Sequence, residues 1–268
     1  MVLKHKFIQF INSNERLSGT HSNFKYKIDL PKDKGDFDRV CILNASLPKS
    51  YYLIPKDSYF TLEEGISSVN IYIQEGNYSR RSFQTVLQNL LNNSSPNNFI
   101  YAVSYPDSFI QSDTGKYTYT VSNNGGIQPK FIFNTHIFKQ MGFNRNSTVQ
   151  FFNNTLTSTN ILKFQSEDII LIHSDLCSNG DNDILHEIYS GSSPTLGSIV
   201  DEVIAVEQNS RVLTSSNSGI YNFIITNEDN EEIEFNGLNI VFTVLFYKKD
   251  PIFDLLEKYI KYRLLQNN

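Results

Sequence analysis

The chain has 268 residues, with 23 Lys and Arg against 28 Asp and Glu and a formal net charge of −5 at pH 7. This balance lacks the basic field that a folded nucleic-acid-binding surface needs, so it argues against genome binding. Hydrophobic residues make up 40% and Trp is absent, which indicates a globular chain whose aromatic packing depends on 20 Phe and 15 Tyr. The length fits one large β domain or a domain with an insertion.

The first residues and the cysteines bear on where the chain is made and kept. The apolar run in residues 1–11 is too short for a signal peptide, and no later stretch approaches the ~20 apolar residues of a membrane span. We therefore expect a chain made and kept in a cytosol-like compartment, with no membrane span. Cys41 and Cys177 form neither a C-x-x-C pair nor a metal-binding spacing, so we expect reduced, structural thiols.

The first 75 residues predict β-strands separated by polar turns. Apolar or alternating segments lie between turn signals, and Pro48 closes the longest of them, where a strand ends, bulges or runs along an edge. The expected strands cover residues 6–12, 24–30, 39–48, 59–62 and 69–73.

A helical period follows Gly76, with Ser79 as the expected N-cap. Apolar residues recur there at i, i+3, i+4, i+7 and i+8, which predicts an amphipathic helix through Phe83, Val86, Leu87, Leu90 and Leu91. Asn123-Asn-Gly-Gly126 is a hairpin turn signal, and Gly142 ends a short second helix. The expected elements are strands 100–104, 116–121 and 130–133 and helix 136–141. Residues 76–159 are therefore predicted as an inserted small α/β unit.

From residue 160 the β pattern returns, and Asp250-Pro251 then starts a last helix. The expected strands cover 161–164, 169–173, 184–189, 198–206, 219–225, 232–235 and 239–247. Because no helix regularly follows each strand, as a parallel sheet would need, the mainly β pattern favours an antiparallel sandwich or barrel. We expect a discontinuous β domain over 1–75 and 160–249, the insertion 76–159, and a C-terminal helix over 250–268.

Three polar segments contain catalytic or metal-binding residue types without the required geometry. His173-Ser174-Asp175 has the residue types of a hydrolase triad, but strand alternation separates Ser174 from the other two. The oxygen-rich segment 175–183 fails the EF-hand pattern because Cys177 and His186 fall where oxygen ligands belong. The acidic run 227–232 is predicted as a hairpin tip. A cupin metal site needs His-x-His, then Glu, then a later His, whereas the histidines here stand singly: His5, His21, His136, His173 and His186.

Arg80 and Arg81 are unusual because two cations in a first helical turn oppose the helix dipole, by roughly 0.3 to 1 kcal/mol each. We keep both as candidate intersubunit contacts, with a solvated pair as the alternative. No residue is assigned a catalytic, cofactor-binding or metal-binding role. We therefore expect a protein that is not an enzyme and needs no cofactor.

Several segments together resemble the penton, or vertex, capsid proteins of virophages and related small double-stranded DNA viruses. The similarity extends along the chain and rests on many short segments rather than on a catalytic signature. They are Ile11-Asn-Ser-Asn-Glu-Arg-Leu-Ser-Gly-Thr20 leading into Ser22-Asn-Phe24, Val40-Cys-Ile-Leu-Asn-Ala-Ser-Leu-Pro-Lys-Ser-Tyr-Tyr-Leu-Ile54, Gly76-Asn-Tyr-Ser79, Ile172-His-Ser-Asp-Leu176 and the strand 239–247.

The resemblance implies a jelly-roll subunit that is synthesised in the host cytoplasm and incorporated in the virion, where five copies surround each icosahedral vertex. Its implied partners are itself as a homopentamer, the major capsid protein and, as further candidates, minor capsid proteins. Family members can carry an insertion domain, which suits residues 76–159. Two other interpretations stay open: a β-sandwich carbohydrate- or receptor-binding module of the spike or lectin type, because lectins share this architecture, and a hydrolase without a recognisable motif.

Overall fold

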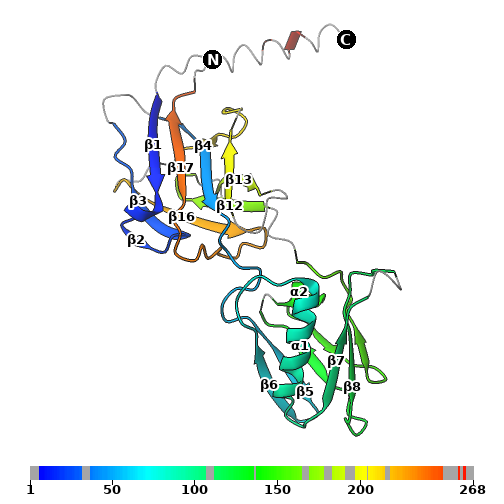
Figure 1. Cartoon of the computed structure of the whole chain (residues 1–268). Helices are drawn as coiled ribbons and strands as arrows, with labels where there is room; N and C mark the ends of the chain where they lie inside the picture. The colour runs from blue at the N-terminus through cyan, green and yellow to red at the C-terminus, as the bar shows by residue number, and fades with distance from the viewer. Residues whose placement is uncertain are drawn as a thin grey trace. The chain divides into compact units, whose positions relative to one another are not determined.

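The computed structural model describes residues 6–31, 37–106, 112–135, 137–164, 169–177, 183–190, 197–203, 205–214, 218–249, 259 and 262–263. The chain divides into two compact units (Figure 1). The first unit is discontinuous, with residues 1–51 and 167–268, and the second contains residues 52–166. In the described residues the structure is mainly β with few helices, and every strand pairing is antiparallel, as the sequence predicts.

The first unit contains two antiparallel sheets, each with five strands in the described residues. One has the order β1-β17-β4-β14, with β15 also pairing with β4, and the other has the order β13-β12-β16-β3-β2. The strands of the first sheet are β1 (Lys6–Asn12), β4 (Arg39–Pro48), β14 (Ser198–Glu202), β15 (Arg211–Val212) and β17 (Val241–Tyr247). Those of the second are β2 (Ser18–Gly19), β3 (Asn23–Lys27), β12 (Ile169–Ser174), β13 (Ile184–Tyr189) and β16 (Ile220–Asn227). A 3-10 turn, η1 (Ser13–Glu15), joins the two sheets after β1.

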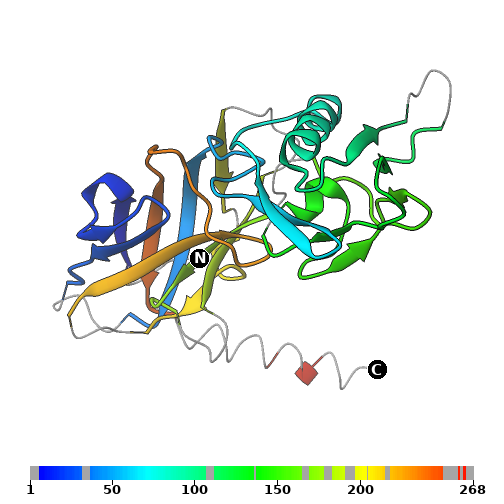
Figure 2. The same ribbon diagram turned by 90° about the horizontal axis from the view of Figure 1, so that it is seen from below.

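The two sheets of the first unit face each other in Figure 2, and side chains from both sheets form one core. Phe223 of β16 lies 5.5 Å from Phe24 of the neighbouring strand β3 and 5.2 Å from Phe242 of β17 in the other sheet, measured between ring centroids. Such ring pairs add about 0.5–1.5 kcal/mol each beyond the burial of their area. The registry of β17 on β4 shifts between Thr243 and Val244, and Leu43 is the extra residue on β4. The bulge keeps apolar residues facing the core on both sides of it.

The second unit packs two small sheets and a helix around its own aromatic core. One sheet has the order β10-β9-β5-β6 and the other the order β11-β8-β7. Phe131 of β9 joins them, because its ring lies 5.2 Å from Phe60 of β5 and 5.2 Å from Tyr119 of β8. The elements are β5 (Tyr59–Glu64), β6 (Ser67–Tyr72), α1 (Arg80–Ser94), β7 (Ile100–Ser104), β8 (Thr118–Ser122), β9 (Lys130–Ile132), α2 (Phe138–Met141), β10 (Thr148–Gln150) and β11 (Thr155–Thr157).

Helix α1 confirms the predicted start and apolar face. Ser79 Oγ accepts a hydrogen bond from Ser82 N at 3.1 Å, and Ser82 Oγ accepts one from Ser79 N at 2.9 Å, which completes a capping box. Phe83, Leu87 and Leu91 are fully buried. Local capping chemistry and the apolar period therefore suffice to position this helix.

The division into units differs from the predicted boundaries at residues 76 and 159. Strands β5 and β6, which we assigned to the first domain, belong to the second unit, because β5 pairs with β9 through Leu62 and Phe131. The second unit therefore begins at Tyr52 and ends at Ser166. The predicted helix over 250–268 falls outside the described residues, apart from helical backbone at Tyr259, Tyr262 and Arg263.

Two predicted strands are not strands. The backbone of 161–164 bonds to a loop and a helix, since Leu162 N donates to Gly115 O at 2.8 Å and Lys163 N to Lys139 O at 3.1 Å. Residues 232–235 form only an isolated bridge, from Glu232 to Thr226. Both segments bury apolar side chains, and the alternation that suggested strands reflects this packing. The second helix is shorter than predicted, since α2 starts at Phe138; His136 lies outside the described residues.

Candidate functional sites

The candidate interface residues Arg80 and Arg81 have partners within their own unit. Arg80 Nη1 donates to Tyr105 Oη at 3.4 Å, and the Arg81 guanidinium lies 6.0 Å from the centre of the Tyr105 ring. Tyr105 Oη in turn donates to Asp113, 2.8 Å from each carboxylate oxygen. The hydrogen bond from Tyr105, a backbone bond from Gly115 and the nearby arginines lower the pKa of Asp113. This local network accounts for two cations in the first turn of α1.

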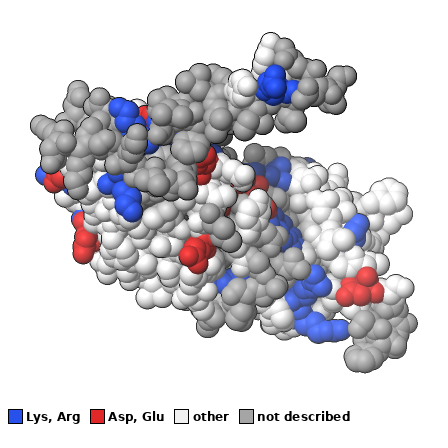
Figure 3. Space-filling view, turned by 90° about the horizontal axis from the view of Figure 1, so that it is seen from above, with Lys and Arg blue, Asp and Glu red and all other residues white. Residues whose placement is uncertain are grey.

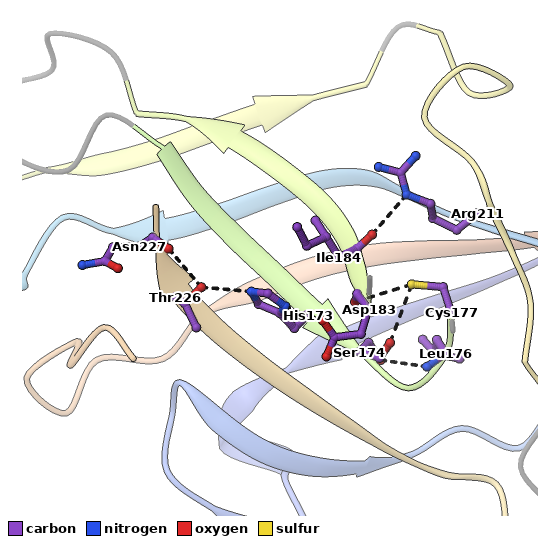
Figure 4. Close-up of polar contacts among 9 residues, drawn as sticks. All are labelled: His173, Ser174, Leu176, Cys177, Asp183, Ile184, Arg211, Thr226 and Asn227. Atoms are coloured by element: carbon purple, nitrogen blue, oxygen red, sulfur yellow. Dashed lines mark hydrogen bonds and ion pairs between the residues drawn. The ribbon is translucent and has the colours of Figure 1, made fainter. Parts of the chain in front are cut away.

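His173, the residue that suggested a triad, lies in the first unit between β13 and β16 (Figure 4). Its Nδ1 lies 2.7 Å from Asp183 Oδ1, and its Nε2 lies 3.0 Å from Thr226 Oγ1. The neighbouring residues bond elsewhere, because Ser174 Oγ accepts from Leu176 N at 3.2 Å and Asp175 Oδ1 accepts from Asn222 N at 2.8 Å. These contacts link β12 to β16 and to the residue just before β13, so they stabilise the sheet.

Cys177 lies in the same cluster but is not set up as a nucleophile. Its Sγ lies 3.6 Å from both Ser174 O and Asp183 O, two hydrogen-bond acceptors. Burial raises the pKa of the Cys177 thiol to about 11, so the thiol stays protonated at neutral pH. Cys41 is also a buried free thiol, and burial raises its pKa to about 11. The two cysteines therefore act as small apolar residues at neutral pH.

A second polar group surrounds Glu232 in the first unit. Its carboxylate accepts hydrogen bonds from Thr20 Oγ1 at 3.0 Å, Ser22 Oγ at 2.8 Å and Asn23 Nδ2 at 3.3 Å. These bonds attach the segment after β16 to the start of β3, beside a cavity of about 540 Å³. The acidic run 227–232 forms a turn, as predicted, and Asn227 Oδ1 accepts from the backbone N of Asp229 and Glu231 within it.

The described residues contain no group of three or more His, Cys, Asp or Glu side chains placed to hold a metal ion. In the oxygen-rich segment 175–183, residues 178–182 lie outside the described part of the chain. No described helix is long and apolar enough to cross a membrane. On the face drawn in Figure 3, Lys and Arg side chains are interspersed with Asp and Glu over a largely uncharged surface.

Sequence reasoning missed the partners of the buried histidines. Asp183 and Thr226 lie 10 and 53 residues from His173, and Asp201 Oδ2 lies 2.6 Å from His186 Nε2, 15 residues away. Nothing in the local spacing indicates these pairs, because they depend on which strands become neighbours. A buried histidine on a strand is the only signal, and it predicts a partner without identifying it.

The chain is similar to known proteins at the level of solved structures. No protein-family model matches the chain, and neither does any curated protein. Among solved structures, the chain is similar to the crystal structure of the mavirus penton protein, with 14% sequence identity and a TM-score of 0.43, over 91% of this chain and 99% of that one. A TM-score of this size supports no functional conclusion about this chain.

Proposed function

We propose that this protein is a structural subunit of a viral capsid, a penton that forms the five-fold vertices of an icosahedral shell and has no enzymatic role. The observation that most directly supports this proposal is the strand order of the first unit. Among the described residues, the first unit has eight strands of five or more residues. Numbered along the chain, they form one sheet in the order first, eighth, third, sixth and another in the order second, seventh, fourth, fifth. This arrangement supports a double-sheet jelly roll, the architecture shared by viral capsid and lectin domains.

The sequence resemblance to penton proteins favours the capsid over the lectin alternative, and its segments lie in the first unit and at the start of the second. Residues 11–24 form the crossing from β1 through η1 to β3, residues 40–54 contain most of β4, and residues 172–176 end β12. All three belong to the framework of the jelly roll and to the start of the inserted unit. The inserted unit occupies the connection between the third and fourth of the eight strands, where a large insertion leaves the sheet order unchanged.

The sheet edges are suited to contacts with neighbouring subunits. Strand β1 pairs only with β17 among the described residues, so its other edge is open, and Ile8 and Phe10 expose their side chains along it. At the opposite edge of the same sheet, β14 exposes Val200. An open strand with exposed apolar residues is a surface that proteins normally cover. We propose that copies of this chain, the major capsid protein and, as further candidates, minor capsid proteins cover these edges in the virion.

Light scattering and negative-stain imaging of the purified protein test the proposal. We expect a species of about five times the chain mass of 30.8 kDa that forms five-fold rings, either alone or with the major capsid protein. Phe10→Asp should shift this species to monomers while leaving the unfolding transition in place. A protein that stays monomeric with the major capsid protein present, and binds defined sugars on a glycan array, would support the lectin alternative instead.

A further inference from the structure

The chain of the second unit runs back and forth between two ends, and the loops at one end form the surface of interest. The chain enters at Tyr52 and leaves at Ser166 at the end that contains the start of α1 and helix α2. The 15 residues of α1 lead away from it over roughly 22 Å. We call the loops at the far end the distal loops: residues 64–66, 95–100, 122–128 and 151–154 (Figure 1).

The distal loops are held together by hydrogen bonds that side-chain amides donate or accept and that one carboxylate accepts. Four of their Asn residues have φ between 48° and 63°, a region that Asn tolerates better than most residues: Asn98, Asn123, Asn153 and Asn154. The bonds between loops include Asn97 N to Glu64 Oε2 (2.9 Å), Asn123 Nδ2 to Asn98 O (3.4 Å), Asn124 Nδ2 to Asn154 Oδ1 (2.8 Å) and Gln128 Nε2 to Asn154 Oδ1 (2.9 Å). Several hydrogen-bonding groups of these loops are therefore paired within the unit, and these bonds hold the loops in one arrangement.

Apolar side chains stand out from these loops into solvent. Ile66 is fully exposed at the tip of the β5–β6 hairpin, next to Gly65 with φ of 67°, and Phe152 is 77% exposed in the β10–β11 turn. Ile100 and Ile127 are 57% and 41% exposed. The second unit exposes only one other Ile or Phe among its described residues, Ile161. Single exposed apolar residues are ordinary, but four at one end of the unit are more than such polar loops normally carry, and we call these four side chains the patch. A Cβ at Gly65, next to Ile66, would lie 3.8 Å from the Ile127 side chain.

The distal loops also lack exposed charge. Glu64 is their one charged residue and is 1% exposed. The nearest charged neighbours in the flanking strands are Glu63 and Lys130, which neutralise each other in an ion pair of 2.6 Å. A partner of this patch therefore needs neither acidic nor basic groups.

We propose that the distal loops bind the surface of a lipid bilayer, with Ile66 and Phe152 entering the boundary between headgroups and acyl chains. Entry there costs little for polar groups that already have partners within the unit, and the exposed apolar side chains gain from leaving water. Ile66 and Phe152, the two most exposed of these side chains, protrude from turns. A bilayer accepts protruding side chains of any shape, whereas a protein partner must supply a matching cavity, and this favours lipid.

A single-tryptophan variant tests the proposal directly. The natural chain contains no Trp, so Phe152→Trp gives fluorescence from the distal loops alone. With millimolar lipid in phosphatidylcholine vesicles, we expect the emission to shift to shorter wavelength and the protein to float with the vesicles. Because the patch has no basic residue, adding phosphatidylserine should not increase the bound fraction.

Two substitutions in the Phe152→Trp background locate the contact. Ile66→Asp should weaken vesicle binding roughly tenfold or more, the loss expected from one buried Ile. Ile161→Asp, an equivalent change at an exposed Ile outside the distal loops, should leave binding unchanged. Circular dichroism checks that both variants fold. Absence of flotation, equal effects of the two substitutions, or a blue shift that grows with protein concentration without lipid would each overturn the proposal, the last in favour of a protein contact.

Discussion

Replacing Glu64 with Ala should destabilise the second unit more than any other change at a charged residue of the distal loops or their flanking strands. Glu64 ends β5 and is 1% exposed. Its Oε1 accepts hydrogen bonds of 2.7 Å from both Ser95 Oγ and Tyr101 Oη, and its Oε2 accepts one of 2.9 Å from Asn97 N. Burial, and then the bond to Glu64, raise the pKa of Tyr101, which keeps its hydroxyl a donor at all ordinary pH values.

The expected loss follows from the three donors that lose their acceptor. A hydrogen bond to a charged group contributes about 1.5–3 kcal/mol, and a buried donor without a partner costs about 1–3 kcal/mol. Removing a buried carboxylate also removes its own desolvation cost, so the sum is reduced. We expect Glu64→Ala to lower the free energy of unfolding by about 3–5 kcal/mol. Glu64→Gln keeps the shape and one acceptor oxygen, so about 1–2 kcal/mol is expected.

Urea unfolding of the whole chain measures the effect, with Trp at position 152 as a reporter in the second unit. Glu63→Ala is the matched control, because Glu63 precedes Glu64 on the opposite face of β5 and forms only the partly exposed ion pair with Lys130. Such pairs contribute about 0–1 kcal/mol. Equal losses for Glu63→Ala and Glu64→Ala would refute the reasoning, since they would mean that the buried carboxylate does not hold the distal loops.

Two further predictions concern buried thiols and backbone strain. Burial raises the pKa of Cys41 and Cys177 from 9.0 to about 11, so the stability from these protonated thiols is complete below about pH 9 and is lost as the pH rises through 11. The unfolding free energy should fall over that interval, and rapid labelling of native thiols at pH 8 would contradict the prediction. Gly142→Ala should cost about 2 kcal/mol or more in urea unfolding, because φ is 76° and a Cβ would lie 2.7 Å from Asn160 O. Gly126→Ala, at φ of 86° in open space, should cost about 1 kcal/mol, and equal losses would contradict a steric cause.

Local chemistry made some elements predictable from the sequence. The apolar period through Phe83, Leu87 and Leu91, with Ser79 before it, requires no knowledge of the rest of the chain, and α1 starts where these residues predict. Strands β4 and β17 were likewise predicted, because each is a long, mostly apolar segment between polar turns. The sequence pattern that predicts each of these elements lies within one short, continuous segment.

The boundary between the units could not be predicted in the same way. Strands β5 and β6 alternate like those before them, and the alternation identifies a buried face without identifying what covers it. Strand β9, the partner of β5, lies about 70 residues later, and that pairing places β5 and its neighbour β6 in the second unit. The partners of His173 were hidden for the same reason, because Asp183 and Thr226 reach it only after β13 and β16 have joined β12.

The turns that carry Ile66 and Phe152 do contain a signal in the sequence, although it differs from a strand or helix pattern. Polar residues and glycine normally occupy such positions, because they satisfy the turn and face water. Gly65 and Asn153, with their positive φ values, meet the needs of these turns, so the adjacent Ile and Phe are not required by the local fold. Where the neighbouring residues already satisfy the turn, an exposed apolar residue is better explained by contact with a partner than by a role in folding. We therefore infer that the distal loops bind a partner, while the two sheets of the first unit form the proposed shell.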